Sequence, residues 1–230
     1  MVAKLPMRKN MKVNMKKGFR PGVDIQYALS FDGIDDYVIA ENVNLGNVTN
    51  SCTLSHWIYF EHWNYDSFPV TAANAGTHAA EYVGFKNNDD SFRFAVYDGS
   101  FNRADQNVSS KYFNQWNHLV GVFDDGTIYL FVNNELVATD SASKAEAQDN
   151  FILGYNPNDD TNNFEGLIDD VRFYDRALSE NEINSLFNRK NITSGLTAYY
   201  PINKGEGSIL YDKSQNSNDG DIIGATWVEV

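Results

Sequence analysis

The chain has 230 residues with 18 basic and 31 acidic side chains, a formal net charge of −13 and a single cysteine. One cysteine excludes a framework of internal disulfides, and without a run of about 20 apolar residues we expect no membrane insertion. Abundant Gly, Asn and Asp and scarce helical periodicity favour one large all-β domain, which at this length can bury a sizeable core.

The first 24 residues form a basic arm on an acidic body. Residues 1–20 hold no acid, whereas the rest of the chain has 11 basic and 31 acidic residues, so we expect no nucleic-acid partner for the body. The arm lacks an apolar core, so it does not predict a secretory signal peptide. It is either a solvated tail that folds back on the body or a docking arm for protein partners in an assembly. Its basic residues are Lys4, Arg8, Lys9, Lys12, Lys16, Lys17 and Arg20.

An acidic turn opens the β domain, which we place at residues 25–230. Residues 28–31 are strand-like and lead into Asp32 and Gly33, and Asp35 and Asp36 follow directly. Three carboxylates within five residues around a glycine can supply oxygen ligands to a hard cation such as calcium. Asp32, the Gly33 carbonyl and Asp36 are therefore candidate metal ligands. The alternative is an ordinary Asp-Gly hairpin turn.

Residues 54–60, LSHWIYF, predict a buried strand with Trp57 in the core and Cys52 as a buried thiol. The irregular stretch 61–81 follows it. Trp63 and Tyr65 are candidate platforms for sugar rings and Asp66 is a candidate hydroxyl ligand, because loops on a rigid sandwich concentrate binding functions. The alternative is that these aromatic side chains cover the edge of the core.

Strands are also predicted at 92–97 and, as a meander of three, across 119–139. Two more polar loops hold candidate ligand-binding residues. One is the loop 98–111, with Phe101. The other is YNPNDDTNNF at 155–164, with Asn158, Asp159 and Asn162. The second loop binds a sugar or a cation, or is simply hydrated.

The stretch 166–178, GLIDDVRFYDRAL, alternates as a strand with one apolar face. Regular alternation places Asp169 and Asp170 on opposite faces, with Asp169 on the side of Val171. A carboxylate on the core side is costly unless it is paired, hydrogen-bonded or bound to a cation. The alternative is a strand-entry turn with both acids solvated. Ser179 and Glu182 then form a capping box that predicts one short helix near 179–188.

Four segments together resemble the laminin-G-like, concanavalin A-like lectin superfamily. They are ALSFDGIDDYV at 28–38, LSHWIYF at 54–60, QWNHLVGVFDDGTIYLFVNNELVA at 115–138 and GLIDDVRFYDRALSENEI at 166–183. The resemblance implies a two-sheet antiparallel jelly-roll sandwich, often with calcium, in binding or adhesion roles. It also implies that the opening loop lies near the closing strand, which would add Asp169 and Asp170 to the calcium ligands, and that Trp116 and His118 are structural.

Residues 195–230 resemble the segment that normally precedes the opening strand in this family, yet here they come last. About 36 residues cannot build their own sandwich core. Three interpretations are open: strands added to the same sandwich by circular permutation, strands exchanged with a neighbouring subunit, or the remnant of a second repeat. Permutation is favoured because termini that meet at the surface tolerate it.

We expect the protein not to be an enzyme. Related sandwiches hydrolyse glycosides with a Glu-x-Asp-x-x-Glu pattern on one strand, and this chain lacks the pattern. The preferred function is a carbohydrate-binding or adhesion module for a glycan or cell-surface polysaccharide, displayed on an assembly such as a phage or virus particle. A capsid-decoration or fibre protein without a glycan ligand is the alternative. The expected location is extracellular or on a virion surface, without a signal peptide.

Overall fold

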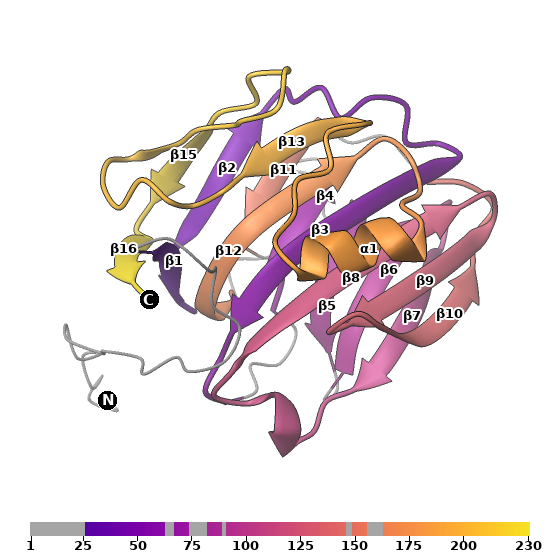
Figure 1. The fold of residues 1–230 in the computed structure, drawn as a ribbon, viewed down its shortest axis with the longest axis horizontal. Helices are drawn as coiled ribbons and strands as arrows, with labels where there is room; N and C mark the ends of the chain where they lie inside the picture. Colours follow the sequence, from indigo (N-terminus) through magenta and orange to yellow (C-terminus); the bar gives the residue numbers. More distant parts are fainter. Residues whose placement is uncertain (1–25, 63–66, 74–81, 89–90, 146–148, 156–162) are drawn as a thin grey trace.

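Two antiparallel sheets of eight strands each, one behind the other, form the protein (Figure 1). The computed structural model describes residues 26–62, 67–73, 82–88, 91–145, 149–155 and 163–230. The predicted all-β jelly-roll sandwich with a single helix is confirmed.

The first sheet has the strand order β10-β9-β8-β3-β12-β1-β16, and β13 pairs with β12 beside this path. Its strands are β1 (Tyr27–Asp32), β3 (Ser51–Tyr59), β8 (Trp116–Asp124), β9 (Thr127–Val132), β10 (Glu135–Ser141), β12 (Glu165–Tyr174), β13 (Leu196–Tyr200) and β16 (Thr226–Glu229). The predicted meander of three strands is β8, β9 and β10, joined by tight turns at 125–126 and 133–134.

The second sheet has the order β14-β15-β2-β11-β4-β5-β6-β7. Its strands are β2 (Tyr37–Glu41), β4 (Val70–Ala73), β5 (Tyr82–Asn88), β6 (Ser91–Tyr97), β7 (Phe101–Asn107), β11 (Asn150–Leu153), β14 (Ile209–Leu210) and β15 (Gly220–Ile223). A short 3-10 helix, Ser110–Tyr112, follows β7.

The main core lies between the sheets, where inward side chains of both are fully buried. Leu54, Val171 and Phe173 come from the first sheet, and Phe94 and Phe151 from the second. Gly121 on β8 leaves room for the Phe94 ring, since a Cβ there would overlap that ring. The Cys52 thiol is buried as predicted, and burial raises its pKa to about 12.

Helix α1 (Glu180–Phe187) lies across the outer face of the first sheet (Figure 1). The predicted capping box is confirmed, because the Ser179 hydroxyl accepts from the Glu182 amide while the Glu182 carboxylate accepts from the Ser179 amide. Ile183 and Leu186 are buried against a second, smaller apolar cluster that includes Val120 and Val122 of β8. Helix α1 therefore buries part of the outer face of this sheet.

The last 36 residues contribute strands to both sheets of the same chain. β16 pairs with β1, β15 pairs with β2, and β13 pairs with β12. The first and last described strands thus lie side by side, as Figure 1 shows for β1 and β16. The choice between permutation and exchange of these strands with a neighbouring subunit stays a prediction.

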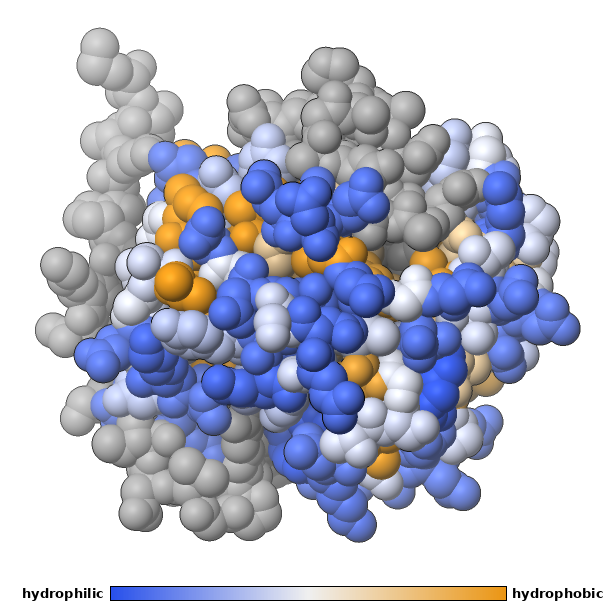
Figure 2. Space-filling model, turned by 90° about the horizontal axis from the view of Figure 1, so that it is seen from above, coloured by the Kyte–Doolittle hydropathy of each residue, from blue (hydrophilic) through white to orange (hydrophobic). Residues whose placement is uncertain are grey.

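The face seen in Figure 2 is mainly hydrophilic, with hydrophobic side chains in small separate patches. Such scattered exposure is normal for a globular surface. The large hydrophobic residues that are exposed among the described residues are Ile34, Phe101, Leu136, Ile209 and Tyr211. No helix in the described part of the chain has the length and hydropathy needed to cross a bilayer.

Candidate functional site

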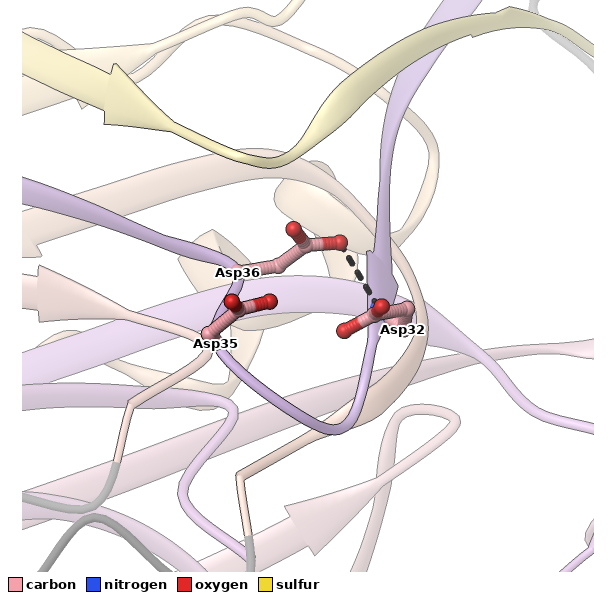
Figure 3. A group of neighbouring side chains, drawn as sticks. All are labelled: Asp32, Asp35 and Asp36. Carbon is pink, nitrogen blue, oxygen red and sulfur yellow. Dashed lines mark hydrogen bonds between the residues drawn. The ribbon is translucent and has the colours of Figure 1, made fainter. Parts of the chain in front are cut away.

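The loop between β1 and β2 gathers three carboxylates. Asp32 ends β1, and Asp35 and Asp36 lead into β2, so that the tight turn at Gly33, with φ of 75°, brings the three together (Figure 3). One ligand oxygen from each lies within 4.8 Å of the others. Asp36 is buried, whereas Asp35 is exposed to solvent. The predicted ligands Asp32, Gly33 and Asp36 are thus in one loop, and Asp35 joins them.

Hydrogen bonds within this loop and contacts from two neighbouring segments hold it in place. The Asp32 amide donates to Asp36 Oδ2 at 2.9 Å, and the Ile34 amide donates to Asp32 Oδ1 at 2.9 Å. The buried Asn163 donates its Nδ2–H to the Ile34 carbonyl at 2.8 Å. Gly224, in the turn between β15 and β16, lies against Asp36 so closely that a Cβ there would overlap the carboxylate. The C-terminal segment therefore forms one wall of the acidic loop.

Crowding and burial make the charged form of Asp36 unfavourable. Burial raises the pKa of Asp36 to about 6, the charges of Asp32 and Asp35 add to the rise, and the hydrogen bond from the Asp32 amide opposes it. Since the folded pKa lies above the ordinary value, protonated Asp36 stabilises the fold. This contribution is complete below about pH 4 and is lost as the pH rises through about 6.

Replacing Asp36 by Asn should therefore stabilise the cation-free protein by about 1 kcal/mol at pH 7, after a discount for solvent screening of the loop. Asn keeps an oxygen that can accept from the Asp32 amide. The measurement is the melting temperature from pH 4 to 8 in a chelator, compared with the exposed control Asp124→Asn. The wild-type stability should decline relative to Asp36→Asn between about pH 4 and 6. Parallel curves for the two proteins would refute this account of Asp36.

Three close carboxylates can do two kinds of chemistry. They can hold a hard cation such as calcium, which prefers oxygen ligands and would relieve the mutual repulsion. They can also act as an acid and base pair, since retaining glycosidases place two carboxyls roughly 5–5.5 Å apart. The second use needs an accessible acid. Asp36 is only 8% exposed, Oδ2 accepts from the backbone and Oδ1 lies against Gly224, so a bulky glycoside is hindered there more than a single ion is. The residues fit a cation better.

The structure does not bring Asp169 and Asp170 to this loop, which corrects the predicted ligand set. In the pairing of β1 with β12, Asp32 lies opposite Glu165, four positions before Asp169. Both acids are instead buried and paired with arginine. Arg189 Nη1 lies 2.9 Å from Asp169 Oδ2 and 3.0 Å from Asp170 Oδ2, and Arg172 Nε lies 2.8 Å from Asp170 Oδ1. Their negative charge is already compensated.

A β-bulge explains why both acids reach the same arginine. Opposite β3, the register of β12 shifts between Asp169 and Arg172, and Asp170 adopts a left-handed φ of 50°. Asp169 pairs with Trp57, whose side chain faces α1, and Val171 packs in the main core. The extra residue therefore puts both carboxylates on the outer face. The prediction that Asp169 shares the face of Val171 is wrong for this reason.

The same outer face contains a serine–histidine pair that the linear order does not reveal. Ser55 Oγ lies 2.9 Å from His118 Nε2, and Trp57 stacks on the His118 ring with 4.9 Å between centroids. Burial lowers the pKa of His118 to about 3, so the ring is neutral at physiological pH. Ser55 and His118 are each 1% exposed, which denies a substrate access to the hydroxyl. The structural role predicted for His118 fits this burial.

Most of the predicted ligand-binding residues lie outside the described residues. This applies to Trp63, Tyr65, Asp66, Asn158, Asp159 and Asn162, and to the basic arm with Lys4, Arg8, Lys9, Lys12, Lys16, Lys17 and Arg20. Phe101 begins β7 with 44% of its surface exposed, 5.2 Å from the Tyr97 ring between centroids. Trp57 is buried, as predicted, although it packs under α1 rather than between the sheets.

The sequence profile of the family Laminin_G_3, described as the concanavalin A-like lectin/glucanases superfamily, matches residues 32–184. The matched range begins at the first acid of the loop and ends within α1, so β13 to β16 lie beyond it. A search of curated proteins finds no match.

Several solved structures share this architecture. A provisionally assigned carbohydrate binding protein from Bacteroides ovatus ATCC 8483 has 17% identity and a TM-score of 0.67, over 90% of this chain and 61% of its own. Domains LG4-5 of the mouse laminin alpha1 chain have 14% identity and a TM-score of 0.53, over 67% of this chain and 44% of theirs. Trypanosoma rangeli sialidase in complex with the inhibitor DANA has 15% identity and a TM-score of 0.53, over 70% of this chain and 27% of its own. At these sequence identities the comparisons show a shared fold and nothing more specific.

Proposed function

Because the chain belongs to the Laminin_G_3 family of the concanavalin A-like lectin/glucanases superfamily, we propose that it is a non-catalytic carbohydrate-binding module that holds a calcium ion with Asp32, Asp35 and Asp36. The chain spans 61% of the Bacteroides ovatus protein and less of the other two. The activities and ligands of those proteins are therefore not transferred to this chain. The proposal rests on what this chain's loop can do.

The acidic triad is the observation that carries the proposal. It lies in the loop that joins β1 to β2, where Gly224 of the C-terminal turn contacts Asp36 and the side chain of Asn163 donates to the Ile34 carbonyl. A bound cation would neutralise the repulsion that raises the pKa of Asp36, and would tie these segments into one rigid edge. Rigid loops that need no reordering on binding favour recognition of weakly held ligands such as saccharides.

Binding fits the site better than hydrolysis does. The sialidase shows that enzymes share this fold, so architecture alone does not choose between the two. In this chain the carboxylate with the raised pKa is buried and engaged by backbone groups, and the Ser55–His118 pair lies beneath α1. Neither arrangement offers a reacting group to a glycosidic bond.

The cation site is tested with Asp35→Asn, because Asp35 is the exposed member of the triad and its replacement leaves the buried contacts intact. We expect the calcium affinity measured by isothermal titration calorimetry to fall by about tenfold or more, since one charged oxygen ligand is lost. Asp124→Asn, at the exposed end of β8, is the matched control and should bind calcium like the wild type. An unchanged affinity in Asp35→Asn would show that calcium, if bound, lies elsewhere.

The carbohydrate role is tested with a glycan array, using the full chain in calcium and in chelator. Retention of a defined set of glycans in calcium, weakened by the chelator, is the expected result. Retention of none under either condition would reject the carbohydrate role. Release of new reducing ends from a retained glycan would instead reveal a hydrolase.

Attachment of the basic arm to a larger particle, display on a virion and an extracellular location are part of the same proposal. Their support is the charge contrast between residues 1–20 and the acidic body. The decoration-protein alternative uses the same arm and differs only in lacking a glycan ligand, which the glycan array decides.

A further inference from the structure

A second candidate ligand site lies in the C-terminal segment, beyond the part of the chain that matches the family. Residues between Pro201 and Lys213, together with Trp227 of β16, line a hollow of about 180 Å³. Pro201, Ile202 and Leu210 are buried and form its apolar part. The hollow shares no residue with the acidic loop.

Aromatic side chains form the rest of the wall. Tyr211 follows β14 directly and is 39% exposed. The Trp227 indole N–H donates to the Gly207 carbonyl at 2.8 Å, which fixes the ring beside the hollow. A sugar ring presents apolar C–H faces that stack on such aromatic surfaces, and a fixed ring loses little entropy when it does so.

Two lysines converge on Tyr211. The Nζ atoms of Lys204 and Lys213 lie 4.9 and 5.3 Å from the centre of the Tyr211 ring. Neither lysine forms an ion pair with another described residue. Asp212, between Tyr211 and Lys213 in the sequence, is buried and accepts from the amides of Tyr199, Ser214 and Asn218. The Asp212 carboxylate is therefore bound by backbone amides in the interior of the protein.

The two lysines lie close to one ring although the chain has a net charge of −13. Each ammonium lies over the Tyr211 ring in a cation–π contact, so two positive charges stand beside the hollow. An anion at the mouth of the hollow would be attracted by both lysines and could accept charge-assisted hydrogen bonds from their ammonium groups. The apolar and aromatic surfaces below would receive the ring that carries this anion.

We propose that the hollow beside Tyr211 is a subsite for one acidic sugar residue, a pyranose that carries a carboxylate or a sulfate, held by Lys204, Lys213 and stacking on the aromatic wall. The inference rests on the proposed carbohydrate-binding function and specifies a ligand class for it. The volume is below the roughly 300–1,000 Å³ typical of pockets for drug-sized ligands, so a single ring of a longer chain enters and the rest stays in solvent.

The test uses the full chain and three hexasaccharides of similar length: a hyaluronan fragment with carboxylates, a heparin fragment with carboxylates and sulfates, and neutral maltohexaose. Binding is measured by calorimetry, and its location by the NMR shift of the Trp227 indole N–H. We expect the acidic fragments to bind, to shift this resonance and to weaken as salt is raised. The relative affinities of the two acidic fragments decide between carboxylate and sulfate.

The variant Lys204→Gln/Lys213→Gln should weaken acidic fragments by about tenfold or more, because two charge-assisted contacts are lost. The matched control is Lys111→Gln, which removes a lysine that lies 4.7 Å from the ring centre of the buried Tyr112. It should bind like the wild type.

The failures are distinguishable. If neutral and acidic glycans bind equally, or the double variant binds acidic fragments normally, the subsite is wrong while the carbohydrate role stands. If acidic fragments shift Trp227 but calcium does not affect any glycan, the subsite stands and the calcium-dependent role fails. If no saccharide binds, both proposals are overturned.

Discussion

Replacing Arg172 by methionine should lower the free energy of unfolding by about 3 kcal/mol, the lower end of the ~3–5 kcal/mol cost of removing one partner of a buried ion pair. Arg172 and Asp170 are 3% and 4% exposed, and Arg172 Nε lies 2.8 Å from Asp170 Oδ1. Burial lowers the pKa of Arg172, but the Asp170 carboxylate together with the neighbouring Tyr199 and Tyr174 raises it above its ordinary value overall. We expect the lower end of the range because Arg189 still contacts Asp170.

The measurement is denaturant unfolding of wild type and variant at pH 7. The exposed Arg103→Met, which removes an arginine 3.6 Å from Asp105, is the matched control and should change stability by less than about 1 kcal/mol. The double variant Asp170→Asn/Arg172→Met should recover part of the loss, because Asn tolerates the left-handed φ at this position and the remaining buried charges, Asp169 and Arg189, are paired with each other. A single variant as stable as wild type would show that the charges are not effectively buried.

Deleting residues 195–230 should abolish folding to a soluble monomer. The deletion removes β16 and β15, which cover one edge of β1 and one edge of β2, and the exposed edges then template aggregation. It also removes Tyr200, which stacks on Phe151 with 5.8 Å between centroids and donates its hydroxyl to the Asn218 carbonyl. With Ala198, Ile202 and Leu210 also buried, the lost burial exceeds about 5 kcal/mol, which is comparable with the ~5–15 kcal/mol net stability of a domain.

Size-exclusion chromatography with light scattering checks this result. The truncated chain should be insoluble or aggregated, and the full chain should elute with the mass of one 26.0 kDa chain. A dimer of the full chain that dissociates only on unfolding would favour exchange of these strands between subunits. A soluble truncated protein with an unchanged melting temperature would contradict the role of these strands in the core.

If both sites bind as proposed, the C-terminal segment serves each of them differently. Gly224 packs against the Asp36 carboxylate, whereas Lys204, Lys213 and Tyr211 line the hollow proposed as the acidic-sugar subsite. Calcium binding at the loop would stabilise the β15–β16 turn, and that turn precedes Trp227 on β16. The two sites are therefore connected by a short stretch of backbone.

Local patterns in the sequence determined much of the fold. The capping box at Ser179 and Glu182 predicts α1 because its hydrogen bonds form within four residues. The strand at 54–60 and the meander across 119–139 follow from apolar patterning and turn-forming pairs. The acid-rich turn from Asp32 to Asp36 is a local feature too, and the structure keeps its carboxylates together for the same reason.

Tertiary structure decided which acids are paired with arginine and which lie together in one loop. Asp169 and Asp170 resemble metal ligands in the sequence, but their arginine partners are 2 to 20 residues away, and a bulge turns both carboxylates to the same face. The contact of Gly224 with Asp36 and the convergence of Lys204 and Lys213 on Tyr211 likewise depend on where β14 to β16 pair. Strand pairing is a long-range choice, governed by burial of the whole sheet, whereas capping and turns are governed by neighbouring residues.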